Sequence, residues 1–127
     1  MYYLAPDRSQ VTRVIDDLVR PNGLVGTADG KTLYVADHGA GKTYAYTIEA
    51  DGSLTNKRLF VATGSDGMEL DAEGQLYLAT PNKIQIFAAD GQHVQDISIP
   101  QETPTNIAFV GETLFITART AVYTYQP

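Results

Sequence analysis

The sequence contains no cysteine among its 127 residues. Disulfide bonds, thiolate metal sites and cysteine nucleophiles are therefore excluded. Positive charge is also scarce, since nine Lys and Arg residues stand against fifteen Asp and Glu residues, for a net charge of −6. The Lys and Arg residues are scattered and form no basic stripe. Because a phosphate backbone is bound by clustered positive charge, we expect no nucleic-acid partner.

No stretch of the chain approaches the roughly 18 consecutive apolar residues that a membrane helix needs. The first ten residues, MYYLAPDRSQ, lack the basic and then apolar segments of a signal peptide. We therefore expect no membrane partner and a cytoplasmic location, while a periplasmic location stays open. The shares of hydrophobic residues (43%) and charged residues (19%) are ordinary for a folded globular domain.

Glycine follows an acidic residue at five places in the chain. Most of these pairs lie between short segments rich in β-branched and aromatic residues. This is a strong β-hairpin signal, because glycine supplies the positive φ that such a turn needs. The five pairs are Asp29-Gly30, Asp51-Gly52, Asp66-Gly67, Glu73-Gly74 and Asp90-Gly91.

The chain also contains an internal repeat, whose units begin at Asn22, Asp66 and Asn106, 44 and 40 residues apart. Apolar residues in these units alternate or form short blocks, whereas a helical repeat would show a 3.6-residue period. A period near 40 with about four strands per unit is typical of a β-propeller blade. The expected strands are 23–28, 32–37, 42–49 and 54–62 in the first unit, and 67–71, 75–80, 83–88 and 93–99 in the second.

The sequence therefore predicts an all-β fold, a partial β-propeller of about three four-stranded blades in a single half-propeller domain over residues 1–127. The one ambiguous segment, VTRVIDDLV at residues 11–19, is interpreted as a strand because of its place before Pro21. The expected division is a partial blade at 1–20, blades at 21–63 and 64–103, and an incomplete blade at 104–127.

Polar side chains stand at the start of the first strand of each unit. In a propeller this strand faces the central channel, so we expect Asn22, Asp66 and Asn106 to converge at one height around the axis. Calcium takes six to eight oxygen ligands from carboxylates, amide carbonyls and water. Asn and Asp without His or Cys suit such a hard cation and not zinc.

Three segments also resemble a known family: RPNGLVGTADGKTLYVAD, GSDGMELDAEGQLYLAT and TPTNIAFVGETLFITAR. They resemble the C-terminal half of the senescence marker protein/gluconolactonase/luciferin-regenerating enzyme family, from about Tyr2 to Tyr125. The resemblance implies a six-bladed propeller with one divalent metal, usually calcium, in the central channel. It also implies hydrolysis of small lactones or related esters.

The resemblance implies roles for individual residues. Asn22, in P-N-G, matches a metal ligand. Asp66, in D-G-M, matches a second ligand that is also implied as general base or nucleophile, and we expect it to act as the base. Asn106 would face the same channel. A further Glu ligand, near the start of full-length members, has no counterpart in this sequence. We expect a calcium-dependent lactonase-type hydrolase whose site is half encoded here, and the alternative is a non-catalytic propeller fragment or assembly module.

Other residues are weaker candidates. His38 follows a predicted strand near the channel mouth, and Arg119 is placed to contact a substrate carboxylate or to lie at a blade edge. His93 is interpreted as structural. The segment GAGK at 39–42 lacks the spacing of a phosphate-binding loop. Ser65 lies in no G-x-S-x-G elbow, so a serine hydrolase is not expected.

A half-ring would leave open sheet faces and unpaired strand edges, which favour association. We expect two copies to pair as a homodimer that closes the ring. Two other outcomes stay open. One is a separate chain that carries the N-terminal half, and the other is that these residues are a piece of a longer protein.

Overall fold

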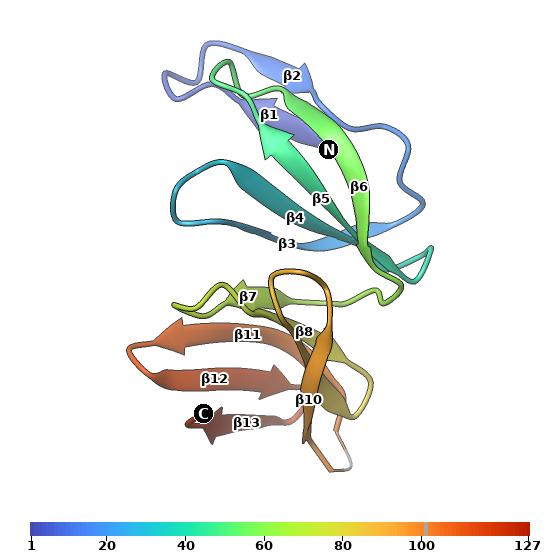
Figure 1. Ribbon diagram of the computed structural model, residues 1–127, viewed down its shortest axis with the longest axis vertical. Helices are drawn as coiled ribbons and strands as arrows, with labels where there is room; N and C mark the ends of the chain where they lie inside the picture. The colour runs from blue at the N-terminus through green and yellow to red at the C-terminus, as the bar shows by residue number, and fades with distance from the viewer. Residues whose placement is uncertain (101) are drawn as a thin grey trace.

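The computed structural model describes residues 1–100 and 102–127, and these residues form β-strands and connecting turns without a helix (Figure 1). No helix that could span a membrane is found in this part of the chain. The expectation of an all-β fold is confirmed. Thirteen strands form four antiparallel sheets. They are β1 (Tyr2–Leu4) and β2 (Val11–Arg13); β3 (Pro21–Gly26), β4 (Thr32–Asp37), β5 (Lys42–Ile48) and β6 (Leu54–Val61); β7 (Met68–Leu70), β8 (Leu76–Thr80), β9 (Lys83–Phe87) and β10 (His93–Ser98); β11 (Pro104–Val110), β12 (Thr113–Ala118) and β13 (Ala121–Tyr125).

Strand order within each sheet follows chain order, so every sheet is a meander. The eight strands predicted for the two complete units are all present, with ends that differ from the prediction by at most two residues. Four of the five acidic-glycine pairs are tight turns in which glycine has positive φ: Gly30, Gly52, Gly74 and Gly91. Gly67 is not in that region of φ. The pair Asp66-Gly67 therefore serves another purpose.

The segment 11–19 differs from its prediction, because only Val11–Arg13 is a strand. The residues that follow pack against the face of the β3–β6 sheet that carries Val35 and Tyr46. There the Met1 ammonium donates to Ile15 O at 2.6 Å and Val14 N donates to Met1 O at 3.0 Å. Ile15 is buried with Val35 and Tyr46. Burial of this side chain has overridden the local strand tendency.

The sheets stack so that their first strands are neighbours, since β3 contacts β7 and β7 contacts β11 (Figure 1). Two hydrophobic cores fill the spaces between consecutive sheets. Each Leu or Ile buried there contributes roughly 1.5–3 kcal/mol. The core between β3–β6 and β7–β10 includes Tyr34, Phe60, Met68, Leu76 and Phe87. The core between β7–β10 and β11–β13 includes Tyr77, Ile84, Ile86, Ile107, Leu114 and Ile116.

A buried carboxylate, Asp37, closes the end of β4 and is 2% exposed. Its Oδ2 accepts from Val19 N at 2.9 Å, and its Oδ1 accepts from Arg20 N at 2.9 Å and Ala40 N at 3.2 Å. Burial raises the pKa of Asp37, but the three N–H donors outweigh burial and hold the pKa below its ordinary value. Asp37 thus fastens the segment before β3 to the turn after β4.

Each of the four sheets lies within one of the predicted units. The sheets β1–β2 and β11–β13, which contain the two ends of the chain, lie at opposite ends of the molecule (Figure 1). The division at residues 20, 63 and 103, and the assignment of all four sheets to one half-propeller domain, stay predictions.

Candidate functional site

A β-bulge interrupts the start of β3 and of β11, which are the first, or inner, strands of their sheets. The register shifts between Pro21 and Leu24 in β3, and between Pro104 and Asn106 in β11. A bulge leaves one residue unpaired and re-aims the side chains beside it. These bulges lie where the sequence placed its candidate metal ligands.

The strand pairing aligns the third unit differently from the sequence repeat. Leu24, Met68 and Ile107 are equivalent, because each faces the third residue of the matching motifs LYVAD, LYLAT and LFITA. Counting back two residues from each gives Asn22, Asp66 and Thr105. The expectation that Asn106 occupies the same place as Asn22 is therefore wrong by one residue, and Asn106 is instead equivalent to the glycine of the other units.

Thr105 was missed because the repeat was anchored on the identity of two asparagines. The sequence does contain a signal for the correct alignment: when Thr105 is matched with Asn22, the preceding residues Pro104 and Pro21 also match. Thr105 Oγ1 donates to Thr117 O at 3.2 Å and lies 3.1 Å from Thr117 Oγ1.

Two glycines let the inner strands approach one another. A Cβ at Gly23 would lie 2.5 Å from Asp66 O, and a Cβ at Gly67 would lie 2.4 Å from Asn106 Oδ1 and 2.7 Å from Asn106 Cα. Such distances are too short for any side chain. Each glycine is thus required for the next sheet to pack closely.

Replacement of Gly67 by alanine is expected to destabilise the chain by roughly 1–3 kcal/mol, because β11 must move away from β7. Urea unfolding followed by circular dichroism measures this. The control is Gly26→Ala in β3, where the nearest atom to an added Cβ is 3.8 Å away. Equal stability of the two variants would contradict the prediction.

Asn22 and Asp66 meet at the inner ends of adjacent sheets. Asn22 Nδ2 donates to Asp66 Oδ1 at 2.8 Å. Both residues line a recess of about 300 Å³, together with Thr105 and Asn106. The Asn106 Oδ1 accepts from Ile107 N at 3.0 Å. Three adjacent sheets thus bring side-chain oxygens to one recess.

The recess offers the types of donor atom that a hard cation prefers. Its side-chain donors are amide, carboxylate and hydroxyl oxygens, and Asp66 is the one carboxylate among the lining residues. No group of three His, Asp or Glu side chains suited to a metal occurs in residues 1–100 and 102–127. The side chains that line the recess also carry fewer oxygens than the six to eight that calcium takes.

His38 and Arg119 lie outside the lining of the recess. His38 follows β4 and is half-buried beside Gly64, and its Nδ1 is buried without a partner among the described residues. Arg119 is exposed in the turn between β12 and β13. Their contact with a substrate stays a prediction.

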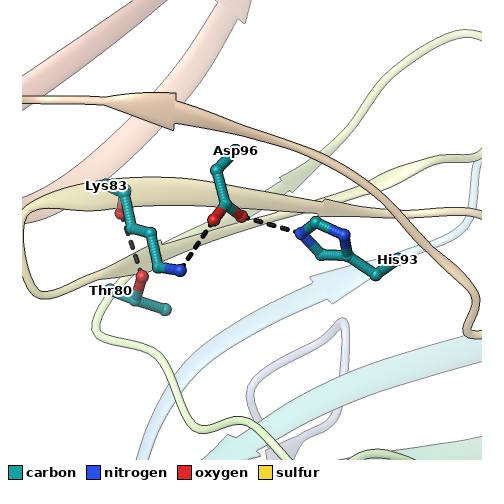
Figure 2. A network of polar contacts seen from close by, with 4 residues as sticks. All are labelled: Thr80, Lys83, His93 and Asp96. Atoms are coloured by element: carbon teal, nitrogen blue, oxygen red, sulfur yellow. Dashed lines mark hydrogen bonds and ion pairs between the residues drawn. The ribbon is translucent and has the colours of Figure 1, made fainter.

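His93 belongs to a separate polar network on the outer strands β9 and β10 (Figure 2). Asp96 joins Lys83 Nζ at 2.7 Å and His93 Nε2 at 2.8 Å. The hydrogen bond from Lys83, followed by that of His93, lowers the pKa of Asp96. The network links two neighbouring strands, which agrees with the structural interpretation of His93.

A larger cavity, of about 590 Å³, lies at the opposite ends of β7 and β11. Asp71, Glu73 and Glu112 line it with Tyr77. Burial, then the nearby Asp71 carboxylate, raises the pKa of Tyr77 to about 12. The phenol therefore stays neutral. The cavity shares no lining residue with the recess around Asp66.

Comparison with known proteins relates the chain to one family. The family profile described as "SMP-30/Gluconolactonase/LRE-like region" matches residues 1–120. The gluconolactonase of Zymomonas mobilis is 32% identical over 134 residues, which cover 93% of this chain and 37% of that protein.

Solved structures agree. The gluconolactonase of Xanthomonas campestris superposes with a TM-score of 0.88 at 32% identity, over 97% of this chain and 42% of that one. A calcium-binding protein, regucalcin, from Agrobacterium tumefaciens gives a TM-score of 0.78 at 26% identity, over 91% of this chain and 43% of that one. The chain thus spans less than half the length of these relatives, and its four sheets are consistent with a partial β-propeller. A profile match over nearly the whole chain, with the same fold in the relatives, shows that the chain belongs to the SMP-30/gluconolactonase/LRE-like family.

Proposed function

We propose that the chain carries one side of a calcium-dependent lactonase site. The observation that supports this is the contact between Asn22 and Asp66 across two sheets, in a recess to which a third sheet adds Thr105 and Asn106. Relatives named gluconolactonase support a lactone as the substrate class. A relative described as calcium-binding supports calcium as the metal.

Asn22 and Asp66 would hold the metal through their side-chain oxygens, with Asn106 as a third donor. A bound calcium ion would polarise the lactone carbonyl and stabilise negative charge on its oxygen. The chain's own oxygens leave most of the coordination to water, substrate or other residues.

Asp66 is the proposed general base, because it is the one carboxylate that lines the recess. Asn22 donates to its Oδ1 and so fixes the orientation of the carboxylate. No side chain in the described part of the chain donates a hydrogen bond to Oδ2. In the proposed mechanism that oxygen would accept the proton of an attacking water.

A non-catalytic module is the second candidate function. The observation that favours it is that a single carboxylate lines the recess, which limits the charge available to a divalent cation. In that case the recess would bind a metal or a sugar weakly without hydrolysis.

Hydrolysis of glucono-1,5-lactone, followed by acid release in a pH-stat, tests the proposal. We expect turnover with millimolar calcium and loss of turnover with excess EDTA, restored by added calcium. A rate unchanged by EDTA would contradict the role of calcium. Calcium binding measured by calorimetry without any turnover would instead favour the non-catalytic module.

A further inference from the structure

The amide of Asn22 lies next to the residue type that covers its own backbone nitrogen least. Among the asparagines of the chain, Asn22 alone precedes a glycine. Glycine has no Cβ, so its backbone nitrogen can approach the carbonyl carbon of the preceding side chain with little steric hindrance. The junction between Asn22 and Gly23 is therefore open to attack by the main chain. The other asparagines, Asn56, Asn82 and Asn106, precede Lys57, Lys83 and Ile107.

The packing of the sheets requires the glycine at this junction. A Cβ at Gly23 would lie 2.5 Å from Asp66 O, which is too short for any side chain. The chain therefore cannot protect Asn22 by placing a larger residue after it. The close approach of two sheets at the recess and the open junction have the same cause.

The main chain at the junction is not part of a regular strand ladder. The register of β3 against β4 shifts between Pro21 and Leu24. Asn22 and Gly23, which lie between them, have no Cα partner in β4. A bulge disrupts the ladder locally. The Gly23 nitrogen must turn toward the Asn22 side chain to react with it, and a bulge resists this motion less than a paired strand does.

The recess gives the Asn22 amide access to water and places a carboxylate beside it. Asn22 is exposed and lines the recess of about 300 Å³. Its Nδ2 donates to Asp66 Oδ1 at 2.8 Å. The amide thus orients the Asp66 carboxylate, and loss of the amide nitrogen would put two carboxylates side by side.

We propose that Asn22 undergoes spontaneous deamidation in the folded chain. The Gly23 nitrogen forms a bond to Asn22 Cγ, the bond between Cγ and Nδ2 breaks, and the N–H proton of Gly23 leaves with the amide nitrogen as ammonia. The product is a five-membered succinimide ring. Water then adds to one of the two ring carbonyl carbons and opens the ring. One opening gives aspartate, and the other gives isoaspartate, in which the main chain runs through Cγ.

Either product changes the recess. A neutral amide is replaced by a carboxylate, which joins Asp66 as a second negative charge among the lining side chains. Asp66 Oδ1 loses the hydrogen bond from Asn22 Nδ2. Two like charges at hydrogen-bond distance repel, so Asp66 is no longer held in one orientation. The modification is detected by mass and charge, and its outcome therefore does not depend on the proposed hydrolysis.

Incubation of the full 127-residue chain at mildly alkaline pH, followed by peptide mapping with mass spectrometry, tests the proposal. We expect a mass gain of about 1 Da at Asn22, because NH is exchanged for O. Conversion should be about ten times faster than at Asn106, which lines the same recess but precedes a β-branched isoleucine. The converted chain should also bind more strongly to an anion exchanger, because it carries an additional negative charge.

A matched variant and an unfolded sample complete the test. In Asn22→Gln the longer side chain would have to close a six-membered ring, and we expect no conversion at residue 22. The original chain in concentrated urea gives the rate of the same junction without folded structure. Conversion in urea but not in the folded chain would overturn the proposal, because the bulge would then protect Asn22. Equal rates at Asn22 and Asn106 in the folded chain would overturn it as well.

Discussion

Replacement of Asp66 by asparagine is expected to lower calcium-dependent lactone hydrolysis by at least about 100-fold. The substitution keeps the shape of the side chain, and asparagine can still accept the hydrogen bond from Asn22 Nδ2. It removes both the proton acceptor and the one negative charge that lines the recess. The pH-stat rate at saturating calcium is the measurement, and calorimetry should give weaker calcium binding in parallel.

The control for this prediction is Asp90→Asn, which makes the same chemical change in an exposed turn. Asp90 Oδ1 accepts from Gln92 N, a bond that the amide oxygen can also accept. We expect unchanged hydrolysis from this variant. If Asp66→Asn kept the full rate while binding calcium weakly, Asp66 would be a metal ligand and not the base.

Replacement of Asp37 by alanine is expected to destabilise the chain by about 3 kcal/mol or more, because three backbone N–H groups lose their buried acceptor. The segment before β3 would be released from the turn after β4. Urea unfolding gives the free energy. Asp29→Ala is the control, since Asp29 is an exposed turn residue, and a much smaller change is expected there.

The same carboxylate makes stability depend on pH. The pKa of Asp37 is lower in the folded chain than its ordinary value of 3.8. Its contribution is therefore complete above that value and is lost as pH falls through the lower, folded pKa. Between pH 5 and pH 3 the original chain should lose more stability than Asp37→Asn. A parallel loss in both chains would assign the acid sensitivity to other groups.

The strands could be predicted from sequence because their signals are local. Each Asp-Gly or Glu-Gly turn fixes where a hairpin reverses, and the runs LYVA, LYLA and LFIT mark the second strands of the sheets. The segment 11–19 shows where local signals are insufficient. Its path depends on Met1 and on burial of Ile15 against another sheet, and these are contacts that strand propensity does not include.

The recess was predictable in part. The equivalence of Asn22 and Asp66 could be recognised because both precede a glycine in the same context, and the structure brings the two side chains into contact. Thr105 was not recognised, because the repeat was aligned on Asn106, one residue further along β11, and a shift of one residue exchanges the side chains between faces. The function of the pair Asp66-Gly67 was likewise hidden, since an acidic-glycine pair looks like a turn until the neighbouring sheet is in place.

The three units differ in a way that limits how this chain could be rebuilt from identical parts. Gly23 and Gly67 each leave room for the neighbouring sheet, while the third unit has Asn106 at the equivalent place. An array made by copying the third unit would meet a side chain at every junction and would open around its axis. An array made by copying the second would close tightly, with an aspartate from every blade at the centre. The spacing of the sheets and the charge at the axis therefore cannot be changed independently, because two adjacent residues at the start of the first strand set both.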